Sequence, residues 1–151
     1  MSLEDLLAER LLRPHTTSSQ EVVQLLAVCQ RDLQDAALPE LSPDRRFVTA
    51  YNAALQAATA ALACRGYRAS ATAHHQTVIS AIPLAMGKQF QDLSEYLNRC
   101  RRKRNAADYD RVGGVSDEEV DELLREAGNF ISDVRLWISD NYPKLVAARD
   151  K

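Results

Sequence analysis

The side chains best suited to chemistry gather in the stretch RCRRKRNAADYD, residues 99–110. Five of the six residues from 99 to 104 are basic, although the whole chain carries a formal net charge of -2. Arginine matches carboxylate and phosphate groups in shape and charge. Amide, carboxylate and hydroxyl groups follow the basic run at once: Asn105, Asp108, Tyr109 and Asp110. The stretch is therefore either a solvated helix end or a binding site.

A structural explanation of the basic run has real weight. Basic side chains near a helix C-terminus are stabilised by the helix dipole. The sequence SDEE, residues 116–119, begins the next predicted helix and could neutralise them. This explanation does not account for the four polar residues within the six positions that follow Arg104.

Composition restricts the function classes. The chain has 151 residues, with 46% hydrophobic and 26% charged residues, which is typical of one soluble globular domain. Its apolar runs are too short to span a bilayer, and the charged N-terminal stretch lacks a signal-peptide pattern, so we expect a cytoplasmic protein. A sequence pI near 5.9 argues against a protein that coats nucleic acid, so a nucleic-acid role requires a local patch.

Metal and cofactor sites are not predicted. The three cysteines are odd in number and widely spaced, which favours free, buried thiols over disulfides or zinc ligands. His74 and His75 are adjacent, and neighbouring positions on a helix do not converge on one ion. We expect one of the two to cap or pack at the end of the bundle, near the arginines. Tyr51 is predicted to be a core residue whose hydroxyl reaches a partner.

Helical periodicity recurs throughout, and no segment alternates like a strand. We predict an all-α, up-and-down bundle of four long helices with one or two short ones, in a single domain with its core bundle in residues 42–141. A short helix is expected over residues 3–12, and a capping box at Ser18 and Glu21 begins the next. Ser42 and Pro43 begin the third helix, and Gly66 ends it.

The basic run lies between two more predicted helices, one that leads into it and one that begins at Ser116. A shorter helix, interrupted by Pro83, is predicted before these two, over residues 74–86. The helix that leads into the run has its inward stripe at Phe90, Leu93, Leu97 and Cys100. Continuing that stripe by four residues places Arg104 on the core face, whereas Arg101 and Arg102 are predicted on other faces. If the helix continues past Arg104, Asp108 lies one turn away and can pair with it. The last long helix begins with a capping box at Ser116 and Glu119.

The basic run and its position between two long helices resemble the HEPN superfamily of small helical proteins in toxin–antitoxin and defence systems. The upstream stretch FVTAYNAALQAATAALACRGYR, followed by two histidines, is similar to the same proteins. The resemblance covers most of residues 42–137. It implies a homodimer that uses an arginine, a polar residue and a histidine to cleave RNA without a metal.

Residue by residue, Arg104 and Asn105 occupy the arginine and polar positions, and Tyr109 occupies the histidine position. Tyrosine titrates near 10 and histidine near 6.5, so Tyr109 is a poor general base at neutral pH. It can still donate a hydrogen bond to a phosphate or stack on a base. The resemblance therefore implies binding of RNA or nucleotide phosphates by Arg101, Arg104, Asn105, Asp108 and Tyr109.

Two alternatives stay open from the sequence. In the first, the chain is a non-enzymatic partner, such as an antitoxin, of a small nucleotidyltransferase. In the second, it is a metal-independent ribonuclease with Arg104 and either Tyr109 or His75 as catalytic groups. No cofactor and no membrane association are expected.

Overall fold

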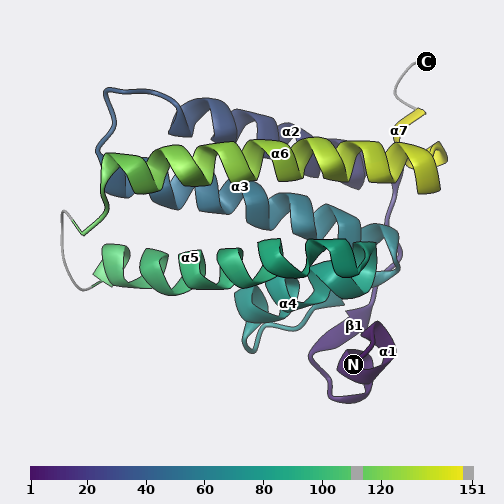
Figure 1. Cartoon of the computed structure of the whole chain (residues 1–151). Helices are drawn as coiled ribbons and strands as arrows, with labels where there is room; N and C mark the ends of the chain where they lie inside the picture. The colour runs from purple at the N-terminus through teal and green to yellow at the C-terminus, as the bar shows by residue number, and fades with distance from the viewer. Residues whose placement is uncertain (110–113, 148–151) are drawn as a thin grey trace.

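Helices dominate the computed structural model, which describes residues 1–109 and 114–147, and the side chains of residues 1–105 and 114–146 (Figure 1). The long helices are α2 (Ser19–Ala36), α3 (Pro43–Cys64), α5 (Gln91–Tyr109) and α6 (Asp117–Asn141). The shorter ones are α1 (Leu3–Ala8), α4 (His74–Met86), the 3₁₀ turn η1 (Lys88–Phe90) and α7 (Lys144–Ala147). The predicted all-α class is confirmed.

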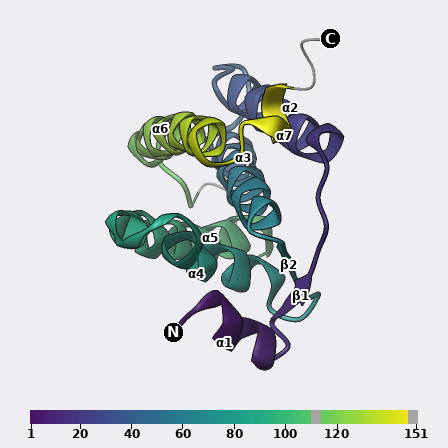
Figure 2. The same ribbon diagram turned by 90° about the vertical axis from the view of Figure 1, so that its right-hand side faces the viewer.

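Helix α3 lies at the centre of the bundle, with α2 and α6 on one side and α4 and α5 on the other (Figure 2). Most of its residues are buried, and many of these are alanines, whose small side chains let neighbouring helices approach closely. By length and composition α3 could also cross a membrane, but 72% of its most apolar window is buried inside the protein. No other helix among the described residues meets that test.

Several predicted helix ends are confirmed by their caps. The Ser42 hydroxyl accepts a hydrogen bond from the Arg45 amide at 3.3 Å, with Pro43 in the first turn of α3. Gly66, just after α3, has φ +93°, a left-handed conformation that glycine adopts without strain. Ser116 and Glu119 form both halves of the capping box at α6. Helix α4 has the predicted bounds, although Pro83 lies inside it and does not interrupt it.

The expectation that no segment forms a strand is wrong. Strands β1 (Leu12–Pro14) and β2 (Tyr67–Ala69) pair antiparallel in a short ribbon. The predicted helix over residues 3–12 therefore ends early, with α1 stopping at Ala8 and Arg10 adopting φ +63°. Strands of three residues are too short to show apolar–polar alternation, so the sequence pattern did not predict them. The ribbon is held by backbone hydrogen bonds between two segments that are far apart in the sequence.

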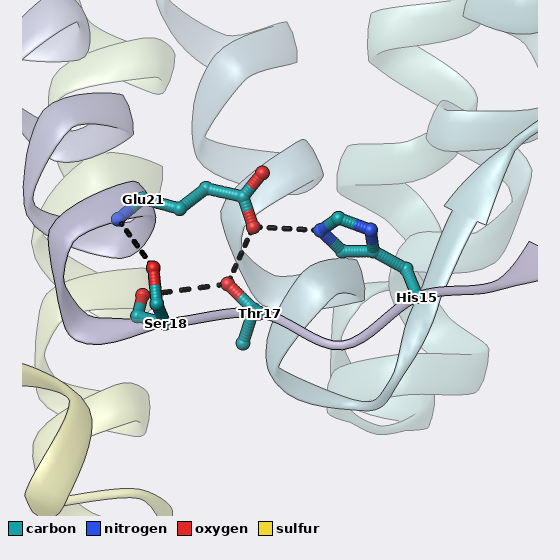
Figure 3. A network of polar contacts seen from close by, with 4 residues as sticks. All are labelled: His15, Thr17, Ser18 and Glu21. Carbon is teal, nitrogen blue, oxygen red and sulfur yellow. Dashed lines mark hydrogen bonds and ion pairs between the residues drawn. The ribbon is translucent and has the colours of Figure 1, made fainter.

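The polar network at the start of α2 also differs from the prediction (Figure 3). Ser18 caps the helix by accepting from the Glu21 amide at 3.1 Å. The Glu21 carboxylate does not return to the cap. It accepts a hydrogen bond from the Thr17 hydroxyl at 2.6 Å and lies 2.7 Å from Nε2 of His15. Only half of the predicted capping box is present, because two side chains outside the helix compete successfully for the carboxylate.

Candidate functional site

The inward stripe of α5 ends in arginine, as predicted. Leu97 and Cys100 are buried, and Arg104 is half-buried at the next position of the stripe. Arg101 does not project to another face as expected. It is half-buried like Arg104, whereas Arg102 between them is exposed. Positions 97, 101 and 104 share one helix face, so a single face carries both half-buried guanidinium groups.

A tyrosine and a histidine from two other helices lie close enough to these arginines for the guanidinium charges to act on them. The Tyr51 hydroxyl of α3 lies 3.3 Å from Nδ1 of His75, in the first turn of α4, and the two ring centroids are 5.9 Å apart. Tyr51 is 1% exposed and belongs to the core. Both predictions are confirmed: Tyr51 is a core residue whose hydroxyl reaches a partner, and one of the two histidines packs near the arginines. We call Tyr51, His75, Arg101 and Arg104 the arginine–histidine cluster.

The positive charges and the burial set the protonation of the pair. Burial lowers the pKa of His75, and the charges of Arg104, His74 and Arg101 lower it further. Burial raises the pKa of Tyr51 to about 12, although Arg101 and Arg104 act in the opposite direction. At pH 7 the cluster therefore holds two guanidinium cations, a neutral imidazole and a protonated hydroxyl. Such a set attracts an anion and offers it hydrogen bonds.

Only part of the basic run belongs to this cluster. Lys103 forms an ion pair with Glu119 at 2.9 Å, so the acidic start of α6 neutralises it, as the structural explanation of the run proposed. The guanidinium carbon of Arg99 lies 5.7 Å from the centre of the Tyr96 ring, a cation–π geometry. The other cation of the run, Arg102, is exposed. Sequence alone does not separate these roles, because all five residues are basic.

The polar residues after Arg104 are described only in part. Asn105 is exposed, and its Oδ1 accepts a hydrogen bond of 3.4 Å from Nη1 of Arg104. Helix α5 runs to Tyr109, so the backbone of Asp108 lies one turn beyond Arg104, as predicted. The side chains of Asp108 and Tyr109, and all of Asp110, lie outside the described residues. Their roles in binding stay predictions.

Cysteine and metal chemistry are not favoured. Cys29, Cys64 and Cys100 are all free and buried, as predicted. Burial raises the pKa of the Cys29 thiol to about 12, and those of Cys64 and Cys100 to about 11, which leaves the thiols protonated and unreactive. Within the described residues, no group of three or more His, Cys, Asp or Glu residues could hold a metal ion.

Of the candidate site, the contacts around His75 were predicted least well from the sequence. The arginines were predicted as a site, but the position of Tyr51 beside them was not. Tyr51 and His75 are 24 residues apart in the chain and come from different helices. The available signal was the two histidines opening a helix next to one that carries a tyrosine on its apolar stripe.

Comparison with known families gives one match. The model of the family described as SAV_6107-like HEPN matches residues 37–135, which contain α3, α4, α5 and most of α6. No curated protein matches the chain significantly, and no solved structure does either. The match includes every member of the arginine–histidine cluster and leaves α1, β1 and α2 outside.

Proposed function

Because the chain belongs to the SAV_6107-like HEPN family, we propose that it binds RNA or nucleotide phosphates at the arginine–histidine cluster. One observation carries the proposal. Two half-buried arginines on a single face of α5 lie beside a histidine whose pKa they help to lower. Asn105, Asp108 and Tyr109 complete the proposed binding region by their position in the sequence.

The chemistry fits a phosphate better than a neutral ligand. Guanidinium groups donate paired hydrogen bonds to phosphate oxygens, and partial burial strengthens them by reducing competition from water. The chain as a whole has a net charge of -2, so attraction of RNA depends on local placement of positive charge. Among the described side chains, no carboxylate forms an ion pair with Arg101 or His75.

The assembly and biological setting are part of the same proposal and rest on the family resemblance. We propose a homodimer in a toxin–antitoxin or defence system, in which two copies of the α5 motif come together. A small nucleotidyltransferase is the alternative partner. Co-purification of that enzyme with a chain that binds no RNA would favour the partner role over the phosphate-binding one.

The test compares Arg104→Ala with Arg102→Ala, because both remove one positive charge from the same helix and only Arg104 belongs to the cluster. We expect Arg104→Ala to weaken binding of a single-stranded oligoribonucleotide about tenfold or more at low salt. Arg102→Ala should change it much less. Equal effects of the two variants would show that the run acts only through its total charge, and absence of binding by the wild type would reject the proposal.

A second candidate function, metal-independent RNA cleavage, is favoured by the neutral imidazole of His75 beside the two arginines. In this reaction the 2′-hydroxyl loses its proton to the imidazole, and its oxygen bonds to the adjacent phosphorus. The bond from phosphorus to the 5′-oxygen breaks, that oxygen takes up a proton from water, and the imidazolium returns its proton to the solvent. Arg101 and Arg104 would stabilise the negative charge on the phosphoryl oxygens.

The test of cleavage uses EDTA to remove metals and compares His75→Gln with His74→Gln. Cleavage that persists in EDTA and is lost only in His75→Gln assigns the base to His75. A rate that rises through a pKa below 6.5 and is level at neutral pH agrees with that base. A rate that rises towards alkaline pH points to Tyr109, and absence of cleavage leaves the binding proposal alone.

A further inference from the structure

A positively charged pocket lies between the β1–β2 ribbon and the start of α4. Its volume is about 290 Å³, and its lining includes Arg13 of β1, Arg68 of β2 and His74 of α4. The residues Arg13 and Arg68 face each other in the register of the two strands. Both arginines are exposed, and within the described residues neither forms an ion pair.

The opposed arginines of the ribbon lower the stability of the fold unless an anion binds to them. Like charges directly opposite each other on antiparallel strands destabilise the pair. The chain has more acidic than basic residues, 21 against 19, yet no described carboxylate neutralises this pair. Nδ1 of His74 donates to the carbonyl oxygen of Ser70 at 3.2 Å, which fixes the ring, and Nε2 donates to an anion only when the ring carries a second proton. Two guanidinium groups, joined by the His74 ring when it is protonated, can therefore donate to an anion in one pocket.

The pocket is joined to the arginine–histidine cluster through two consecutive residues. His74 lines the pocket, and the centre of its ring is 6.0 Å from that of His75 in the cluster. A chain of nucleotides carries a phosphate at every step, so one strand bound at the cluster can place a further phosphate at a neighbouring cationic pocket. The ribbon and α4 lie next to each other at the same end of the molecule (Figure 2).

We propose that Arg13, Arg68 and His74 form a second phosphate subsite for a single RNA strand that also occupies the arginine–histidine cluster. The inference rests on the proposed function and extends it from a phosphate-binding site to a track for an RNA strand. It also assigns a role to the ribbon, of which β1 lies outside the family match.

The experiment measures binding of a labelled oligouridylate of about 12 nucleotides, within the usual range of single-strand site sizes, and of uridine triphosphate. The variant is Arg13→Ala/Arg68→Ala. The control, Arg31→Ala/Arg125→Ala, also removes two exposed arginines, from α2 and α6, and it differs in that Arg31 forms an ion pair with Asp32 at 3.1 Å. Because Arg13 and Arg68 are exposed and repel each other, we expect the variant to be at least as stable as the wild type in thermal unfolding.

We expect the variant to bind the oligonucleotide about tenfold more weakly than the control and to bind uridine triphosphate unchanged. The slope of log affinity against log salt concentration should become shallower by about 0.7, because the variant loses one phosphate contact and each single-strand contact contributes about 0.7. Oligonucleotide affinity equal to that of the control would overturn the subsite. So would an equal loss for uridine triphosphate, which would make the pocket a separate nucleotide site.

The two proposals fail in different ways. If Arg104→Ala loses RNA binding and Arg13→Ala/Arg68→Ala does not, the proposed function stands and the subsite is rejected. If only Arg13→Ala/Arg68→Ala loses binding, the pocket binds RNA without the cluster, and both the track and the proposed site are rejected. If the wild type does not bind the oligonucleotide at all, both proposals are rejected together.

Discussion

His15 and His75 are both half-buried and both bonded to another side chain, but the groups around them carry opposite charge. His15 meets the Glu21 carboxylate, which also accepts from Thr17, so its network is satisfied within the protein (Figure 3). His75 meets the Tyr51 hydroxyl and the positive charges of Arg101 and Arg104. The first arrangement joins the segment before α2 to the first turn of that helix, whereas the second places positive charge where we propose that a phosphate binds.

The comparison shows that a histidine and its hydrogen-bond partner do not by themselves distinguish a structural contact from a candidate binding site. The charges of the other side chains around the ring make that distinction. A carboxylate beside a histidine stabilises the protonated ring and neutralises it. Two nearby guanidinium groups favour the neutral ring and add a local attraction for anions. Each prediction below changes one component of this difference.

The largest effect should come from introducing a carboxylate beside Arg101, which forms no ion pair with any described carboxylate. Asn98 Oδ1 accepts from Nε of Arg101 at 2.9 Å, so Asn98→Asp changes one atom and creates an ion pair there. We expect RNA affinity to fall about tenfold, because the new charge competes with phosphate for Arg101. The pKa of His75 should rise at the same time, which NMR titration of the ring measures. Unchanged affinity and pKa would show that Arg101 has no part in the site.

The reverse change removes the carboxylate from the network at α2. We expect Glu21→Gln to lower the free energy of unfolding by about 0.5–1 kcal/mol, less than the roughly 1.5–3 kcal/mol usual for a hydrogen bond to a charged group, because the Glu21 side chain is 40% exposed. Glu118→Gln, another first-turn acid, is the control for loss of charge at a helix N-terminus. RNA binding should not change in either variant. Denaturant unfolding gives the stabilities.

The stability difference between wild type and Glu21→Gln should itself depend on pH. Hydrogen bonds from Thr17 and His15 lower the pKa of Glu21 below its usual 4.5. The folded state therefore binds this proton more weakly than the unfolded state, so the contribution is complete above 4.5 and is lost as the pH falls through the folded pKa. A difference that is constant from pH 7 to pH 3 would contradict the role of the carboxylate charge.

His75 should show a loss of stability in a different pH range. Its folded pKa is lowered below 6.5, so the unfolded state takes up the proton first as the pH falls. The wild type should therefore lose stability between about pH 6.5 and the lower folded pKa, and His75→Gln should lack this loss. Unfolding measured from pH 8 to pH 5 tests both. A folded pKa of His75 above 6.5 would place a carboxylate, not cations, next to the ring.

The smallest effect concerns the hydroxyl of Tyr51. Its 3.3 Å hydrogen bond to His75 is long, so Tyr51→Phe should lower the free energy of unfolding by only about 0.5 kcal/mol. Tyr67→Phe is the matched control, because this half-buried tyrosine forms no side-chain hydrogen bond within the described residues. If the two variants lose the same stability, the hydroxyl of Tyr51 does not hold His75 in the cluster.

Local features of the sequence predicted the elements well. The caps at Ser42 and Ser116, the stop at Gly66 and the bounds of α4 depend on residues within one helical turn, and all are confirmed. The stripe ending in Arg104 follows from the same period, since positions four residues apart share a face. The charge and length of the basic run were visible too, although not which of its members face the cluster.

The tertiary structure alone decided which distant groups meet. The pairing of Leu12–Pro14 with Tyr67–Ala69, the approach of Tyr51 and His75 to the arginines, and the choice of Glu21 for His15 join groups with no common local pattern. The approach of Tyr51 and His75 to the arginines depends on how α3, α4 and α5 pack, because packing sets side-chain distances between helices and hydrogen bonding within a helix does not. The sequence by itself determined the helices and the family. The packing of the helices determined that a buried tyrosine and a neutral histidine lie beside two arginines.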